Sequence, residues 1–196
     1  MAGPVIFFDT EATDLEPGQI CQLAYLIENN GTVTGHNDFF SVDDMSAGAQ
    51  EVHGFSREML SELSCNTWFE DKAAEILMVF NSAELLVGHN VAADERYLRV
   101  EMERANLKLK KVHTFCTMNY ASGIMNMQRK VVTGRPKPPK LQELAEYYGI
   151  TPQEVEEKTR QLFKSEETAL HDARYDTAMT YLCFKRAIEK GDLRGL

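Results

Sequence analysis

Two carboxylates, Asp9 and Glu11, follow directly after an apolar run at residues 5–8. Four β-prone apolar residues in succession predict a strand that is buried on both faces. Side chains alternate along a strand, so Asp9 and Glu11 are expected to project from the same face. Two neighbouring negative charges at the end of a buried strand are costly unless a cation neutralises them, which predicts a Mg²⁺ or Mn²⁺ site. The other interpretation is an ordinary hydrated strand end.

Two later segments each combine a histidine with acids near the start of an expected helix. The combination suits hydrolysis at a metal centre, because carboxylates bind hard cations and a histidine can accept a proton at neutral pH. The residues are His89, Asn90 and Asp94 in the first segment, and His171, Asp172 and Asp176 in the second.

The last of these segments allows two arrangements. On a regular helix, positions five apart lie about 140° apart, so His171 and Asp176 would not share a face. Asp172 and Asp176 would share one, which permits them to be a ligand pair. The alternative places His171 in the loop before the helix, with Asp172 as the N-cap and Asp176 as the ligand. Geometry alone permits both arrangements, and the resemblance described below favours the alternative.

The elements that position these residues begin with three strands. Residues 19–28 alternate between apolar and polar, Asn30-Gly31 is a strong hairpin signal, and residues 32–40 return as a strand. We therefore expect an antiparallel meander.

The rest of the chain alternates helices with short strands. We expect helical turns over 47–60, a helix over 67–81 and a strand over 85–87. A helix over 91–105, with Asn90 as a plausible cap, and a strand over 112–116 follow. Gly and Pro then predict a flexible basic loop over 118–140. The last expected helices are 141–148 and a C-terminal one that starts near Asp172 and runs through Ile188.

This order of elements predicts an α/β fold in one domain that covers residues 1–196. Antiparallel strands followed by alternating strands and helices give a mixed β-sheet flanked by helices, with parallel additions to the first three strands. The order agrees with a ribonuclease H-like architecture.

Charge is unevenly distributed along the chain. The formal net charge is −9, which argues against a large non-specific grip on nucleic acid. Residues 104–142 nevertheless contain no acid. This stretch is either a solvated surface or a basic flank for a phosphodiester substrate. Its basic residues are Arg104, Lys108, Lys110, Lys111, Arg129, Lys130, Arg135, Lys137 and Lys140.

The remaining composition points to a cytoplasmic protein. The four cysteines are scattered without a C-x-x-C pair, which suits buried thiols in a reducing compartment. No secretory signal pattern is present at the N-terminus, and no apolar run is long enough to span a membrane.

Taken together, the three acidic motifs resemble those of a known family. D-x-E, H-N-x-x-x-D and H-x-x-x-x-D occur here in the order and at about the intervals of the DEDDh, or DnaQ-like, 3′→5′ exonucleases. The resemblance covers most of the chain, and three ordered motifs are far more specific than any one of them.

The resemblance implies a two-metal site with Mg²⁺, for which Mn²⁺ can substitute. Asp9 would bridge both ions, and Glu11 and Asp176 would hold the ion that carries the attacking water. Asp94 would orient the second ion, and His171 would be the general base. Two ions about 3.5–4 Å apart stabilise the attacking and leaving oxygens of an in-line displacement.

The resemblance also implies substrate contacts next to the first motif. Thr10, Ala12 and Thr13 flank the carboxylates where family members meet the terminal nucleotide. Family members commonly carry Gly where this chain has Asp14, so the local turn and the fit of the terminal sugar depart from the pattern.

Three further residues are candidates for substrate binding. Phe55 could stack on a base or belong to the core. His89 could touch substrate or make a structural hydrogen bond at a strand-to-helix turn. Asn90 could contact substrate or only cap its helix.

The function that the resemblance implies is removal of nucleoside 5′-monophosphates from the 3′ end of single-stranded nucleic acid, with DNA favoured. A protein partner could recruit the enzyme. Two other classes stay open: a 3′-end-binding or trimming module inside a larger nucleic-acid-processing complex, and an exoribonuclease of the RNase T or oligoribonuclease kind. A Mg²⁺ phosphohydrolase acting on free nucleotides would share the carboxylates without needing a basic flank.

Overall fold

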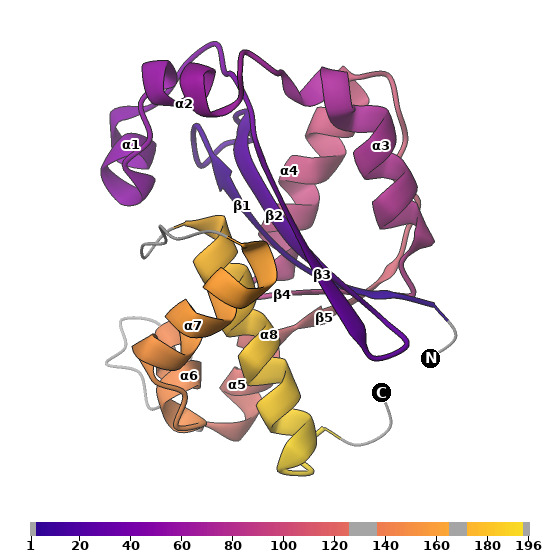
Figure 1. Cartoon of the computed structure of the whole chain (residues 1–196), viewed down its shortest axis with the longest axis vertical. Helices are drawn as coiled ribbons and strands as arrows, with labels where there is room; N and C mark the ends of the chain where they lie inside the picture. Colours follow the sequence, from indigo (N-terminus) through magenta and orange to yellow (C-terminus); the bar gives the residue numbers. More distant parts are fainter. Residues whose placement is uncertain (1–2, 126–136, 165–171, 194–196) are drawn as a thin grey trace.

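The computed structural model describes residues 3–125, 137–164 and 172–193. Five strands form one sheet in the order β3-β2-β1-β4-β5, and helices cover both of its faces (Figure 1). The strands are β1 Val5–Ala12, β2 Ile20–Asn29, β3 Thr32–Phe39, β4 Leu85–Gly88 and β5 His113–Cys116. The helices are α1 Ala47–His53, α2 Arg57–Leu63, α3 Phe69–Ser82, α4 Val91–Arg104, α5 Thr117–Ile124, α6 Leu141–Tyr147, α7 Pro152–Phe163 and α8 Ala173–Glu189.

The sheet is mixed, as predicted. Strands β1, β2 and β3 pair antiparallel, and β4 and β5 join parallel to β1. The β2–β3 hairpin turns at Asn30 and Gly31, whose φ angles of 50° and 79° are of the kind these two residues tolerate best. The predicted ribonuclease H-like fold class is therefore confirmed.

Alternation along β1 separates its two faces. Ile6 and Phe8 pack in the core cluster that includes α3 and α4, whereas Val5 and Phe7 pack against Phe184 of α8. Asp9 and Glu11 continue the second series and so face α8. Thr10 continues the first series and faces α4.

The end of β1 is shaped by a bulge in its neighbour. Glu11 pairs with Gln22, but Ala12 pairs with Ile20, so Cys21 is the extra residue. The buried carboxylate of Glu101 on α4 accepts a hydrogen bond from the Ile20 N–H at 2.7 Å. Helix α4 therefore supports the start of β2, which pairs with the end of β1 beyond Glu11.

Two features differ from the sequence prediction. Residues 117–124, most of which fall in the expected 118–140 loop, form helix α5 instead. Helix α7 is missing from the predicted elements, although Thr151 caps it and Pro152 opens it. Residues 126–136 of the expected loop lie outside the described residues. Among the described helices, none has the length and apolar character needed to cross a membrane.

Candidate active site

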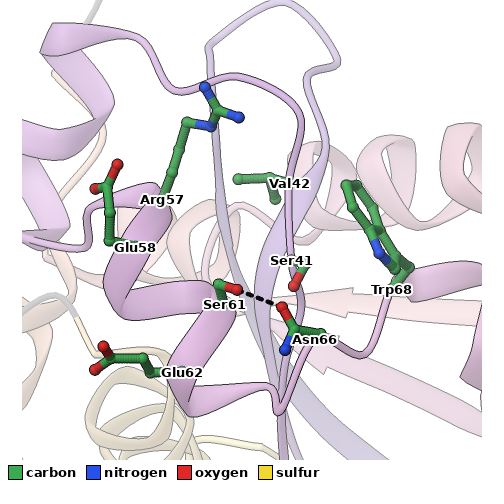
Figure 2. A pocket seen from close by; sticks show the side chains of 8 residues that line it. All are labelled: Ser41, Val42, Arg57, Glu58, Ser61, Glu62, Asn66 and Trp68. Carbon is green, nitrogen blue, oxygen red and sulfur yellow. Dashed lines mark hydrogen bonds between the residues drawn. The ribbon is translucent and has the colours of Figure 1, made fainter.

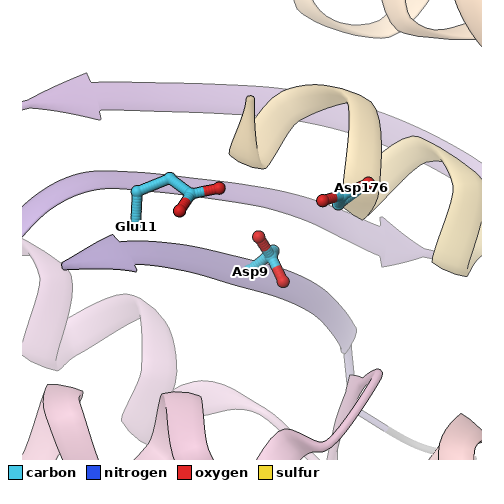
Figure 3. Close-up of side chains that lie close together, drawn as sticks. All are labelled: Asp9, Glu11 and Asp176. Atoms are coloured by element: carbon cyan, nitrogen blue, oxygen red, sulfur yellow. The ribbon is translucent and has the colours of Figure 1, made fainter. Parts of the chain in front are cut away.

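Three carboxylates meet at the carboxyl end of β1. One ligand atom from each of Asp9, Glu11 and Asp176 can be chosen so that all three lie within 4.8 Å of one another. Figure 3 shows Asp9 and Glu11 projecting from the sheet towards Asp176 on α8. The donor set consists only of carboxylate oxygens, which fits a hard divalent cation such as Mg²⁺ or Mn²⁺.

The electrostatics of this cluster favour a cation. Burial, followed by the charges of Asp94, Asp176 and other nearby acids, raises the pKa of Asp9 well above its ordinary value. Burial and the charges of Asp176 and Asp94 likewise raise the pKa of Glu11 to about 9. Without a cation these groups tend to retain protons, and a divalent ion would displace them.

Asp94 approaches the cluster from the other face of the sheet. Its Oδ1 atom accepts hydrogen bonds from the Thr10 N–H at 3.1 Å and the Thr10 hydroxyl at 2.7 Å. Burial raises the pKa of Asp94 to about 7, although the bonds from Thr10 oppose the shift. Asp94 does not belong to the three-carboxylate group, but its charge contributes to the raised pKa of Asp9.

The Asp172 carboxylate is hydrogen-bonded to residues outside the three-carboxylate group. It is the N-cap of α8, as the favoured arrangement predicts, and its Oδ1 accepts from the Arg174 N–H at 2.9 Å. The same oxygen accepts from Gln22 Nε2 at 3.0 Å and Arg174 Nε at 2.8 Å. Asp176, and not Asp172, is the α8 acid that joins Asp9 and Glu11.

His89 is held by two polar partners. Its Nε2 lies 3.0 Å from the Pro139 carbonyl oxygen and its Nδ1 lies 3.0 Å from the Thr117 hydroxyl. Burial lowers the pKa of His89, which favours the neutral ring. Since a carbonyl oxygen only accepts, Nε2 carries a proton and donates to Pro139. The Thr117 hydroxyl beside Nδ1 also donates to the Gly88 carbonyl oxygen at 3.3 Å. These bonds fit the structural interpretation of His89.

Asn90 does not cap α4 in the expected manner. It occupies the N-cap position in a left-handed conformation, with φ of 69°, and its side chain makes no capping hydrogen bond. Asparagine tolerates this conformation better than most residues, so its backbone geometry accounts for its place at this turn. The predicted N-cap position of Asn90 is therefore confirmed, but the side-chain hydrogen bond expected of a cap is absent.

A cleft of about 580 Å³ opens beside Asp9 and Asp176, and we call it the Asp176 cleft. Its lining also includes His89, Lys137 and Lys140. Two lysine side chains therefore border a cleft that also includes Asp9 and Asp176 in its lining.

A second cleft of about 330 Å³ is lined by Glu11, and we call it the Glu11 cleft. Thr10, Glu11 and Ala12 line it, together with Leu15 and Tyr97, which the sequence analysis did not single out. Leu15 is 90% exposed. An apolar side chain projecting into solvent beside a carboxylate cluster is a signal that only the fold reveals.

Hydrogen bonds within the loop after β1, and from Tyr97 of α4 to that loop, fix its conformation. Buried Thr13 does not line the Glu11 cleft; its hydroxyl accepts from the Gln19 N–H at 3.0 Å. The Tyr97 hydroxyl donates to the carbonyl oxygens of Asp14 at 2.7 Å and Leu15 at 3.1 Å. Asp14 lines the cleft and has no positive φ, so the turn does not require the glycine expected from the resemblance.

Phe55 belongs to a small apolar cluster beside the site. Its ring lies 5.2 Å from that of His53, nearly parallel, and 5.4 Å from that of Phe39, edge on. His53 lines the Glu11 cleft, but Phe55 lines neither cleft. The packing fits the core interpretation of Phe55.

The basic residues from Arg104 onward lie in different parts of the fold. Arg104 donates to the carbonyl oxygens of Pro17 and Gly18, both at 2.9 Å, and Lys110 donates to that of Asn81 at 2.5 Å. Residues 108–111 precede β5 and lie near the amino ends of the parallel strands, opposite the carboxylates. Arg129, Lys130, Arg135 and His171 lie outside the described residues.

A third cleft, of about 480 Å³, lies between α2 and the start of α3 (Figure 2). Ser61 donates a 2.5 Å hydrogen bond to Asn66 there, and Arg57 and Trp68 line it. None of the predicted site residues lines this cleft.

The comparisons with known proteins agree with this geometry. A family model described as exonuclease (RNase_T) matches residues 6–184. E. coli exonuclease I in complex with a dT13 oligonucleotide is 18% identical with a TM-score of 0.69, and the match covers 97% of this chain and 43% of that chain.

Two other structures of the E. coli enzyme are similar in the same way. Its complex with a 5cy-dT13 oligonucleotide is 16% identical with a TM-score of 0.72, covering 98% of this chain and 41% of that one. Its zinc-bound complex with single-stranded DNA is 16% identical with a TM-score of 0.71, covering 97% and 41%. The chain thus spans less than half the length of these structures. At sequence identities this low, the similarity shows a shared fold only. No curated protein gives a significant match.

Proposed function

Because the chain belongs to the exonuclease family whose model matches residues 6–184, we propose that it hydrolyses nucleic acid from the 3′ end and releases nucleoside 5′-monophosphates. The observation that carries the proposal is the convergence of Asp9, Glu11 and Asp176 within 4.8 Å. Such a group of acids is costly in the absence of a cation, so its presence at a strand end has a functional explanation.

We propose that Asp9, Glu11, Asp94 and Asp176 hold two divalent cations, Mg²⁺ or Mn²⁺. Bound there, the ions would supply a nucleophilic hydroxide and would stabilise the leaving oxygen. The raised pKa values of Glu11 and Asp94 support the proposal, because a bound cation would offset the burial and the neighbouring negative charges that raise them. The Thr10 hydrogen bonds keep Asp94 oriented at the edge of the cluster.

We propose His171 as the general base from its place in the third motif. A histidine with an ordinary pKa of about 6.5 can accept a proton from water at neutral pH. Asp172, which follows it, is fixed as the N-cap of α8.

The two clefts suggest how a strand would lie. The 3′-terminal nucleotide would occupy the Glu11 cleft, where Thr10, Ala12 and Leu15 meet it. The preceding phosphates would follow the Asp176 cleft past Lys137 and Lys140. Single-stranded DNA is the favoured substrate, which agrees with the oligonucleotides in the similar structures.

A matched pair of labelled substrates tests this function. Single-stranded DNA labelled at the 5′ end should give a ladder that shortens with time, and the same strand labelled at the 3′ end should release labelled mononucleotide at once. Both reactions should require Mg²⁺ or Mn²⁺ and stop with EDTA. Binding without shortening would contradict the proposal and favour an end-binding module. A parallel RNA strand measures the sugar preference.

A further inference from the structure

Gln22 is a buried amide that lies directly opposite Glu11 on the neighbouring strand. Residues paired in this way share a face of the sheet, so Gln22 projects towards α8, as Glu11 does. A side chain that is 0% exposed at the edge of a carboxylate cluster needs hydrogen-bond partners of its own.

The partners of Gln22 tie β2 to the start of α8. Its Nε2 donates to Asp172 Oδ1 at 3.0 Å and to Asn37 Oδ1 at 2.8 Å, and its Oε1 accepts from the Ala173 N–H at 3.1 Å. One amide therefore fixes both the N-cap side chain and the first N–H of the helix. Asp176 lies one turn further along the same helix.

Asp172 is a potential competitor of Asp176. The two acids are four residues apart on the chain, and the Asp172 carboxylate is hydrogen-bonded to Gln22, the residue that lies opposite Glu11. The bonds from Gln22 and Arg174 hold the Asp172 carboxylate against β2.

We propose that Gln22 is a positioning residue that determines which acid of α8 serves the metal centre. By holding Asp172 on β2, it fixes the first turn of α8 and leaves Asp176 directed at Asp9 and Glu11. The inference deepens the proposed function and rests on it, because it assumes that the carboxylates bind cations. A glutamate at position 22 would lack the amide donors and would add a charge beside Glu11 and Asp172.

Mn²⁺ binding followed by electron paramagnetic resonance tests the inference without relying on turnover. Gln22→Leu should raise the Mn²⁺ dissociation constant about tenfold, the size of effect found when a group that orients a ligand is lost. Asn37→Ala breaks the same network on the side away from α8 and should change the constant less than about twofold. The double variant Gln22→Leu/Asp172→Asn should recover most of the affinity, since the neutral side chain at position 172 no longer competes.

Two outcomes would overturn this inference and leave the proposed metal centre intact. One is Mn²⁺ binding by Gln22→Leu equal to that of the wild type. The other is a double variant that binds no better than Gln22→Leu. If Gln22→Leu does not fold, as judged by circular dichroism, Gln22→Asn replaces it, because its shorter amide cannot span the same gap. Wild-type protein that binds no Mn²⁺ would overturn the proposed metal centre and, with it, the inference.

Discussion

The two clefts that are lined by carboxylates of the cluster differ in chemistry. The Glu11 cleft is walled by apolar side chains such as Leu15 and carries the acid Asp14, whereas the Asp176 cleft is bordered by Lys137 and Lys140. An apolar wall suits a base and sugar, and cations suit phosphates. Under the proposed function, this difference would give a strand a direction across the carboxylates, with its 3′ end in the cleft whose described lining contains no lysine or arginine.

The largest expected effect comes from replacing Asp176, one of the three clustered carboxylates. Asp176→Asn should lower kcat by about 1000-fold, equivalent to ~4 kcal/mol of transition-state stabilisation, because a metal ligand is lost. Asp172→Asn is the matched control and should retain most activity, since Asp172 caps the helix. A nuclease assay that ranks the two variants in the opposite order would contradict the ligand assignment.

The next largest effect should come from the apolar wall. Leu15→Ala removes a side chain that is 90% exposed in the free protein and that would be covered by the terminal nucleotide. The loss of about 1.4 kcal/mol of apolar contact should reduce kcat/KM about tenfold. Met78→Ala, which changes an exposed apolar residue on α3, should have no effect on kcat/KM; equal losses in both variants would remove Leu15 from the binding site.

A smaller, salt-dependent effect is expected from the basic wall. Lys137→Gln/Lys140→Gln should raise KM several-fold and reduce the slope of log KM against log salt by about 1.4, which is 0.7 for each phosphate contact. Lys108→Gln/Lys111→Gln changes exposed lysines near the amino ends of the parallel strands and should alter neither quantity. Identical salt slopes in both double variants would show that the Asp176 cleft does not follow the strand.

The last expected effect concerns stability and pH, not activity. The folded protein holds a proton on Glu11 up to a pKa of about 9, whereas an unfolded glutamate loses it near pH 4.3, so metal-free stability should fall as pH rises between these values. Glu11→Gln should therefore raise the Tm at pH 8, by about 2–4 °C for each kcal/mol, and leave it unchanged at pH 4. Thermal denaturation in EDTA measures this; a lower Tm of Glu11→Gln than of the wild type at pH 8 would contradict the raised pKa of Glu11.

Much of the sheet, and the family to which the chain belongs, could be predicted from the sequence because the signals are local. The apolar run at residues 5–8 and the hairpin at Asn30-Gly31 predict β1, β2 and β3, and these predictions are confirmed. Membership in the DEDDh exonuclease family, predicted from three ordered motifs, is confirmed by the match over residues 6–184.

The walls of the site could not be predicted in this way. Leu15 and Tyr97 are 82 residues apart, and only the fold joins them through a 3.1 Å hydrogen bond. The lysines at 110 and 140 belong to one basic stretch in the sequence, yet strand β5 and helix α5 intervene between them. The role of Thr10 as the partner of Asp94 depends on which face of β1 it occupies opposite α4, and spacing alone does not identify that partner.

The central claim, that the acids form a cation centre, is tested most directly by calorimetric titration of Mn²⁺ into the metal-free protein at pH 7. The titration is repeated in two buffers with different ionisation enthalpies. We predict binding of two ions with release of protons, since the cations displace protons held by Glu11 and Asp94. Absence of binding, or binding that persists unchanged in a variant with both Asp9→Asn and Glu11→Gln, would contradict the account.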